Sequence, residues 1–132
     1  MRCEDPDCPV CLTEECGNCC RESIGYEIWC RECEKYGRRA FMHGETGRTA
    51  RIRCGEHRDA LVGKRGALWE HCVEFHDRKE MQFGYKVVGS FRDPLQRQLD
   101  EARRIEEECG ILMNSKNEWV RPAGVRHTVE RM

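Results

Sequence analysis

Residues 24–57 read IGYEIWCRECEKYGRRAFMHGETGRTARIRCGEH, and this stretch decides the fold. Two short apolar, β-prone runs, at residues 24–29 and 40–43, predict a pair of strands. A polar turn then leads into a predicted helix, on which Arg53 and His57 lie four residues apart and share one face. Two strands that lead into a helix with an arginine and a histidine on one side predict a phosphate-handling site.

The remainder of the chain predicts further helices and one more strand. By apolar spacing and composition, the elements that follow are a helix over residues 49–62, a helix after 66 with an apolar stripe that reaches 75, a strand over 83–91 and a helix from 94 that stops at 110. Thr46 or Thr49 fits as the cap of the first helix, and Asp93 fits as the cap of the last. This order predicts an α+β fold in one modest domain.

The apolar residues of each helix predict which side is buried. In the first helix the residues available for the inner side are Ile52, Leu61 and Val62. In the last helix they are Leu95, Leu99, Ala102 and Ile105.

The charges of the chain nearly cancel but are unevenly distributed. The 132 residues carry a formal net charge of −1. Residues 1–22 hold six acidic and two basic side chains, whereas residues 31–66 hold ten Lys or Arg and five acids. A uniformly basic nucleic-acid binder is therefore excluded, while a local basic region fits contact with phosphate.

Eleven cysteines are the most informative feature of the composition. The chain shows no charged-then-apolar leader and no apolar run of membrane-spanning length, so we expect an intracellular protein. An odd number of cysteines fits a complete disulfide framework poorly. In a reducing compartment, C-x2-C pairs more often bind zinc.

Residues 3–20, CEDPDCPVCLTEECGNCC, contain six of these cysteines and almost no apolar side chain. Because such a segment cannot bury a core, four thiolates around a zinc ion are the predicted source of its order. The predicted ligands are Cys3, Cys8, Cys11 and Cys19, with Cys16 and Cys20 as alternatives to the last.

Cys30 and Cys33 form another C-x2-C pair at the end of the first strand. Their predicted partners are His71 and His76, because C-x2-C followed by H-x4-H lies within the ligand spacing of zinc sites. Two residues five apart on a continuous helix diverge, so these histidines converge only if the helix ends or tightens before His76. Cys72, four residues before His76, is the alternative to His71.

Several short motifs, taken together in this order, resemble the core of the GIY-YIG nucleases. They are Gly25-Tyr26, then MHGETGR at 42–48, then R-x3-H at Arg53 and His57, then R-x3-E-A-x2-I at 97–105, then MNSKNEW at 113–119. More narrowly, GETGR followed by R-x3-H resembles the endonuclease domain of Penelope-like retroelements. In such domains a cysteine pair lies within the core and histidines follow the catalytic helix, as Cys30-Cys33 and His71-His76 do here.

The resemblance implies a small three-stranded antiparallel sheet flanked by helices, in the order β-β-α-α-β-α. It also implies a division into a zinc-binding segment at 1–22, a nuclease domain with an internal zinc site at 23–122, and a tail at 123–132. The partners that it implies are DNA and a reverse transcriptase domain or retroelement ribonucleoprotein, in the nucleus and without a membrane.

The implied activity is that of a metal-dependent DNA endonuclease that nicks one strand per active site. Tyr26 would position or deprotonate the attacking water, and His57 would orient that water or assist proton transfer. Arg53 would bind the scissile phosphate, a role that suits its planar and permanently charged group. Glu101 would hold Mg²⁺ or Mn²⁺. Asn114 would match the family's late asparagine near the site.

One position departs from the family pattern. The second motif normally has a tyrosine two residues before its glycine, and that position is Met42 here, beside His43. Methionine neither transfers a proton nor donates a hydrogen bond to phosphate. His43 replaces the tyrosine only if the strand register shifts by one residue. A second hypothesis is therefore a zinc-stabilised DNA-binding module with impaired catalysis. A thiol-redox protein is less favoured, because neither C-x2-C pair has a thioredoxin-like context.

Overall fold

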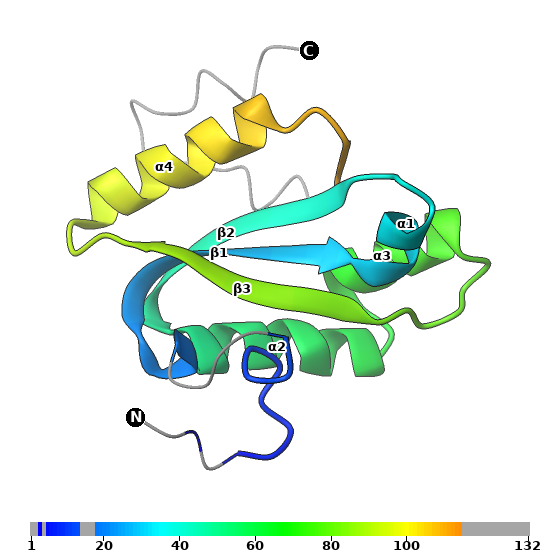
Figure 1. The fold of residues 1–132 in the computed structure, drawn as a ribbon, viewed down its shortest axis with the longest axis horizontal. Coiled ribbons are helices and arrows are strands. Elements are labelled where there is room, and N and C mark those ends of the chain that lie inside the picture. Colours follow the sequence, from blue (N-terminus) through cyan, green and yellow to red (C-terminus); the bar gives the residue numbers. More distant parts are fainter. Residues whose placement is uncertain (1–2, 4, 14–17, 115–132) are drawn as a thin grey trace.

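The computed structural model describes residues 3, 5–13 and 18–114 (Figure 1). Its elements in chain order are the 3-10 helix η1 (Asn18–Cys20), β1 (Glu22–Cys30), α1 (Arg31–Lys35), β2 (Ala40–Thr49), α2 (Ala50–Val62), α3 (Gly66–Phe75), β3 (Phe83–Ser90), α4 (Pro94–Glu107) and β4 (Ile111–Leu112). The tail predicted at 123–132 lies outside the described residues. Within the described part, no helix is long and apolar enough to cross a membrane.

The four strands form one mixed sheet in the order β3-β1-β2-β4. β1 pairs antiparallel with β2 and with β3, whereas β4 pairs parallel with β2 at Ala40 and Phe41. The fold is α+β, but the sheet corrects the prediction of three antiparallel strands. A strand of two residues is too short to show an alternating pattern, so the sequence gives no sign of β4.

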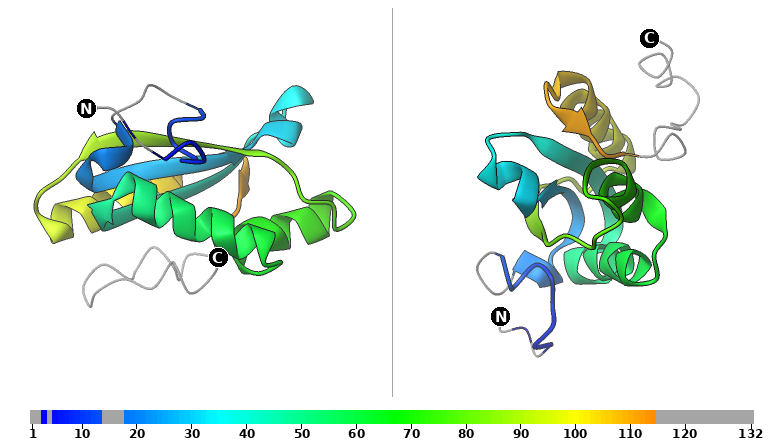
Figure 2. Two further views of the ribbon diagram at one scale, coloured as in Figure 1. Left: turned by 90° about the horizontal axis from the view of Figure 1, so that it is seen from below. Right: turned by 90° about the vertical axis from the view of Figure 1, so that its right-hand side faces the viewer.

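The sheet separates two helical layers. Figure 1 shows α4 along one side of the sheet and α2 along the other, and the two views of Figure 2 show the same layers. Ile24, Tyr26 and Ile28 of β1 are fully buried, and Met42 of β2 is buried opposite Ile28. Gly25 lies on the other face of β1, where the guanidinium of Arg104 from α4 packs against it.

The helix starts follow the predicted caps. The Thr49 side chain accepts a hydrogen bond from the backbone N–H of Ile52 at 3.2 Å, so Thr49 and not Thr46 caps α2. The Asp93 side chain accepts one from the N–H of Leu95 at 3.0 Å, which confirms the cap of α4.

The inner side of α2 is only partly as predicted. Leu61 is buried, but Ile52 and Val62 are exposed. The buried residues of α2 are Ala50, Cys54 and Leu61.

The inner side of α4 is only partly as predicted: Ala102 is buried and Ile105 is half-buried, but Leu95 and Leu99 are 49% and 44% exposed. The helix instead buries Arg97, Glu101 and Arg104. The prediction fails at the two leucines because the sheet offers α4 backbone carbonyls and an acidic side chain, which arginines bind and leucines do not. Burial of a charge is tolerated where it has such partners.

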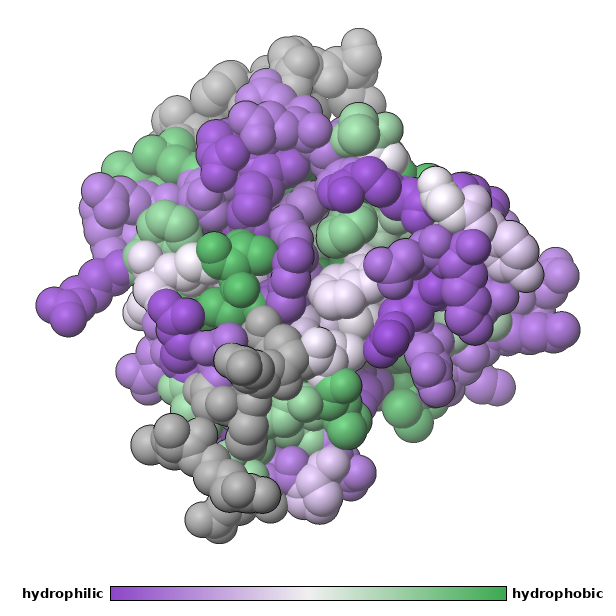
Figure 3. Space-filling view, viewed as in Figure 1, coloured by the Kyte–Doolittle hydropathy of each residue, from purple (hydrophilic) through white to green (hydrophobic). Residues whose placement is uncertain are grey.

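The surface is strongly hydrophilic. The mean hydropathy is −0.81, and Figure 3 shows a mostly hydrophilic face with small, separated apolar patches. η1 and residues 5–13 lie beside α2 (Figures 1 and 2), where Arg58 donates a hydrogen bond to the backbone carbonyl of Asp7.

Candidate catalytic site and metal centres

The hydroxyl of Tyr26 is the centre of a small hydrogen-bonded cluster. His57 Nε2 lies 2.8 Å from the Tyr26 oxygen, and Arg53 Nε donates to the same oxygen at 3.3 Å. Tyr26 projects from β1, while Arg53 and His57 project from one face of α2. Since α2 begins directly after β2 at the cap of Thr49, the strand pair and this helix face are held close together. The structure thus brings three of the predicted residues into direct contact.

Gly44 explains how the tyrosine ring fits. Gly44 is the cross-strand partner of Tyr26, and a Cβ at Gly44 would lie 2.2 Å from the Tyr26 Cζ and 2.4 Å from its hydroxyl. Any side chain at residue 44 would therefore displace the ring. The glycine of the second motif is needed because the Tyr26 ring covers its Cα.

The protonation state of this cluster follows from its surroundings. Burial, and to a lesser degree the charge of Arg53, lowers the pKa of His57 to about 3, so His57 is neutral near pH 7. Because Arg53 donates to the Tyr26 oxygen, the hydroxyl proton of Tyr26 can point to His57 Nε2. Tyr26 is buried, whereas the Arg53 side chain is 31% exposed. A ligand from solvent would therefore meet Arg53 first.

Arg48 and Glu56 adjoin this cluster and were missed by the sequence reasoning. The Glu56 carboxylate accepts hydrogen bonds from Arg53 Nη1 at 2.9 Å and from both terminal nitrogens of Arg48 at 2.7 Å. Arg48 lies in β2 and Glu56 lies in α2, eight residues later. No helical or strand periodicity relates such positions, which is why sequence spacing did not find the pair.

Glu101 comes to the sheet from the other side. It lies on the buried face of α4, between Arg97 and Arg104. Arg97 pairs with Glu45 of β2 at 2.7 Å. Arg104 donates to the backbone carbonyl of Gly44 at 2.9 Å. Glu101 therefore belongs to the helix that packs behind the Gly44 backbone, on the face of the sheet opposite the Tyr26 ring.

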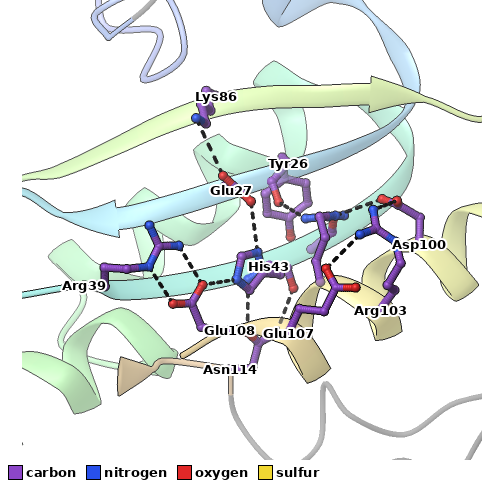
Figure 4. Close-up of polar contacts among 12 residues, drawn as sticks. Tyr26, Glu27, Arg39, His43, Lys86, Asp100, Arg103, Glu107, Glu108 and Asn114 are labelled. Atoms are coloured by element: carbon purple, nitrogen blue, oxygen red, sulfur yellow. Dashed lines mark hydrogen bonds and ion pairs between the residues drawn. The ribbon is translucent and has the colours of Figure 1, made fainter. Parts of the chain in front are cut away.

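The position of the second-motif tyrosine is occupied by a core methionine. Met42 is fully buried on the same face as Tyr26, whereas His43 pairs with Glu27 across the strands and lies on the opposite face. His43 Nε2 lies 2.7 Å from Glu108, and its Nδ1 lies 3.2 Å from Glu27 (Figure 4). The register is not shifted, so His43 does not replace the missing tyrosine.

Asn114 lies beside His43 and not within the Tyr26 cluster. Its Nδ2 donates to the His43 carbonyl at 2.8 Å, and its Oδ1 accepts from the His43 N–H at 3.0 Å (Figure 4). These two bonds continue the pairing of β4 along β2. The structure therefore shows Asn114 holding the chain after β4 against β2, and not beside Tyr26 as the resemblance implies. Residues 115–119 of its motif lie outside the described part.

The N-terminal cysteine group could hold a metal ion such as zinc. Its donor sulfurs lie within 4.8 Å of one another and belong to Cys3, Cys8, Cys11 and Cys19. Cys20 is beside the group, 3.8 Å from Cys19 between sulfurs, and Cys16 lies outside the described residues. Burial raises the pKa of Cys19 above its ordinary value, and a divalent cation would offset this by binding thiolates.

The second group, Cys30, Cys33, His71 and His76, could likewise hold a metal ion. Cys33 Sγ lies 3.5 Å from Nε2 of both histidines, and Cys30 Sγ lies 3.4 Å from that of His76. α3 ends at Phe75, and His76 leaves it with φ −136°, which is how residues five apart converge. Burial lowers the pKa of His71 to about 4, so it is the neutral imidazole that a metal requires.

Cys72 is buried but does not belong to the second group. The sequence alternative of Cys72 for His71 is therefore not the arrangement that the structure adopts. Within the described residues these are the two groups that could hold a metal ion, and Glu101 is in neither.

Comparison of the chain with protein-family models, curated proteins and solved structures finds no significant match in any of the three. The functional argument therefore depends on the geometry of the chain itself.

Proposed function

We propose that this chain is a metal-dependent DNA endonuclease domain of the GIY-YIG type, which hydrolyses one phosphodiester bond per active site. The observation that carries the proposal is the direct hydrogen bonding of Tyr26, Arg53 and His57. Tyr26 lies 27 residues before Arg53 and 31 before His57, and the resemblance to the family predicts all three. The ring of Tyr26 over Gly44 gives independent support, because it explains why the second motif requires glycine.

The residues of the cluster can divide the chemistry of hydrolysis among them. Arg53 would bind the phosphate, since its partly exposed guanidinium is permanently charged. As water attacks phosphorus and the bond to the leaving sugar oxygen breaks, the Tyr26 oxygen can accept a hydrogen bond from that water and orient it. Neutral His57 would hold the Tyr26 hydroxyl in place by accepting its proton in the existing 2.8 Å hydrogen bond.

Glu101 is the residue that would hold a Mg²⁺ or Mn²⁺ ion. Its carboxylate offers a hard oxygen, and no group of three or more possible ligands surrounds it within the described residues. Such a site suits Mg²⁺, which commonly takes one or two ligands from protein and the rest from water and phosphate. When bound, the ion would neutralise charge on the phosphate and on the leaving oxygen, which requires the scissile phosphate to reach from Arg53 to the α4 side of the sheet, where Glu101 lies.

The two cysteine-containing groups would hold structural Zn²⁺. Zinc prefers donor sets of this kind, with four sulfurs in one group and two sulfurs and two imidazoles in the other. Four protein ligands fill the tetrahedral coordination of zinc, so neither site would leave a coordination position open for substrate. Their roles would be to order the N-terminal segment and to join the end of β1 to α3.

A DNA-binding module with impaired catalysis is the alternative, and Met42 is the observation that favours it. Met42 occupies the core position on the Tyr26 face where the family has a second phenol. The basic side chains near Arg53 would still bind phosphate without that phenol.

Nicking of supercoiled plasmid DNA in the presence of Mg²⁺ or Mn²⁺ separates the two functions. An endonuclease converts the plasmid to open circles only when metal is present. Arg53→Ala and Glu101→Gln should each slow nicking by about 100-fold or more. Arg51→Ala, which removes an exposed arginine of the same helix, is the matched control and should stay within a few-fold of wild type.

Two results would decide against the endonuclease. If wild type binds DNA in a salt-dependent way but does not nick it with either metal, the module is correct; Met42→Tyr should then produce nicking. If Arg53→Ala nicks as fast as wild type, the activity does not come from this site.

A further inference from the structure

The Glu56 carboxylate is held by two arginines at the edge of the proposed catalytic site. Both of its oxygens face the two terminal nitrogens of Arg48 at 2.7 Å, and one of them also accepts from Arg53 Nη1 at 2.9 Å. Arg53 in turn donates from Nε to the hydroxyl of Tyr26. The Arg53 guanidinium therefore lies between the Glu56 carboxylate and the Tyr26 hydroxyl and bonds to both.

This arrangement is not required by the fold. The Arg48 and Glu56 side chains are 54% and 42% exposed, and ion pairs as open as this contribute little to stability. Neither residue is part of the core. The unusual feature is the location of Glu56. Its exposed carboxylate binds the guanidinium of Arg53, which is the group that a substrate from solvent would meet first.

We propose that Arg48 is a second phosphate-binding residue of this site, and that Glu56 occupies in the free protein the position that a DNA backbone phosphate takes in the complex. The inference rests on the proposed DNA-cleaving function and adds to it a residue that fixes where the backbone lies. The two non-bridging oxygens of a phosphodiester match the two oxygens of a carboxylate, and a guanidinium binds either as a fork.

The charges favour such an exchange. Hydrogen bonds from Arg48, and secondly from Arg53, lower the pKa of Glu56 to about 2, so Glu56 is an anion at neutral pH. Two guanidiniums against one carboxylate leave the group with a surplus positive charge, which attracts a further anion. Glu56 lies on the exposed side of α2, so its side chain can turn to solvent when a phosphate arrives.

The proposal makes opposite predictions for the two partners of one ion pair. Arg48→Ala should weaken binding of a fluorescent DNA duplex about 5- to 20-fold and reduce the salt dependence by about one phosphate contact. Glu56→Gln, which keeps the shape and removes the charge, should tighten binding about 3- to 10-fold. If the pair were only a structural salt bridge, both variants would weaken binding or leave it unchanged.

Matched controls separate this effect from the general change of charge. Arg51→Ala removes one exposed positive charge of α2, and Glu74→Gln removes one exposed negative charge of α3. Each should change the affinity less than two-fold. Competition by inorganic phosphate at millimolar concentration shows which anions the site accepts. If the site binds any phosphate, inorganic phosphate should displace DNA more effectively from Glu56→Gln than from wild type. If the site needs the DNA backbone, inorganic phosphate should displace DNA poorly from both proteins. Either result supports the exchange.

The outcomes that overturn the proposal are distinct from those that overturn the nuclease. If Glu56→Gln binds DNA no tighter than Glu74→Gln while wild type nicks plasmid, Glu56 is not a substitute for phosphate and the nuclease stands. If the opposite effects of the two variants appear and no protein nicks, the phosphate site stands and the nuclease falls. A chain that does not bind DNA overturns both. Thermal melting of every variant should match wild type; a large loss of stability in Arg48→Ala would make the pair structural.

Discussion

The two faces of the sheet are stabilised by different chemistry. On the face toward α2 and α3, the buried side chains are mainly apolar, as at Ile28, Met42 and Leu68. On the face toward α4, the buried side chains include charged ones, as at Arg97 and Arg104. Yet Tyr26 projects from the apolar face toward Arg53 and His57, whereas the charged face carries Glu101 and contacts the same strands through backbone carbonyls and the Glu45 side chain.

The difference indicates that the charged face positions the catalytic strands from behind. Arg104 donates to the carbonyls of Tyr26 at 3.1 Å and of Gly44 at 2.9 Å, and it pairs with Asp100 at 2.8 Å. An apolar contact tolerates sliding, whereas these hydrogen bonds are satisfied in one register. Arg104 thus binds the backbone of both Tyr26 and Gly44. On the other face of the sheet, the Tyr26 ring packs against the Cα of Gly44.

The largest effect is expected on the apolar face, from loss of its metal group. Cys33→Ser should reduce the zinc content from about two ions per chain to about one and abolish cooperative unfolding. The reason is that zinc binding in small sites contributes about 10–16 kcal/mol, as much as the whole stability of a domain. Zinc analysis and circular dichroism measure both effects.

Cys72→Ala is the matched control for the metal group. Cys72 is also a buried cysteine of α3, but it lies outside the group, so this variant should keep about two zinc ions per chain. Zinc loss in Cys72→Ala and not in Cys33→Ser would show that the ligands are wrongly assigned.

On the charged face, the largest effect is expected at Arg104. Arg104→Met leaves the Asp100 carboxylate and two buried carbonyls without this partner, so we expect a loss of about 3–5 kcal/mol in the free energy of unfolding. Arg103→Met removes an exposed arginine that also pairs with Asp100 and should cost less than about 1 kcal/mol. Urea unfolding measures both, and equal losses would mean that the buried contacts of Arg104 are not special.

The contrast between the faces also explains what the sequence could predict. The C-x2-C and H-x4-H pairs of the candidate metal groups and the shared face of Arg53 and His57 follow from local spacing. The caps at Thr49 and Asp93 follow from local chemistry. These predictions need only short-range information.

The buried face of α4 violates the rule that charged side chains are exposed. Its arginines are buried because backbone groups of distant strands bind them, and no periodicity of the helix records this. One signal was present: Asp100 and Arg104 lie four apart, and Gly25 lacks the side chain that would exclude the guanidinium. The sequence shows both facts, but it does not show that Arg104 packs against Gly25. That contact depends on how α4 packs on β1, which only the folded structure reveals.

A substitution at Gly44 tests how tightly the Tyr26 ring packs against the Cα of residue 44. Gly44→Ala would place a methyl group within 2.6 Å of three atoms of the Tyr26 side chain, so we expect a loss of about 1–3 kcal/mol in stability and of the Tyr26–His57 hydrogen bond. Gly55→Ala is the control, because a Cβ there meets nothing within 4 Å and alanine favours the helix by about 1 kcal/mol. If Gly44→Ala is as stable as wild type, the ring is not tightly held.

The smallest expected effect is on the pH dependence of stability, which should differ between the two faces of the sheet. Burial lowers the pKa of His57 to about 3 from an ordinary 6.5, so the unfolded chain takes up this proton first and stability falls as the pH drops below about 6.5. Pairing with Arg39 lowers the pKa of Glu108 to about 2 from 4.5, so its contribution is complete above about pH 4.5 and is lost below it. Between pH 6.5 and 5, only His57 of these two groups titrates.

Replacing each group should therefore alter a different part of the pH profile. In His57→Gln, the fall in unfolding free energy from pH 7.5 to 5.5 should be smaller than in wild type by about 1 kcal/mol. In Glu108→Gln, loss of the carboxylate itself should not alter that fall, because Glu108 stays ionised throughout this range. Urea unfolding at both pH values, with equal zinc, measures the differences, and contributions from the metal ligands cancel between variant and wild type. A change in Glu108→Gln at pH 5.5 would mean that the charged face already titrates there, and the two faces would then not be electrostatically independent.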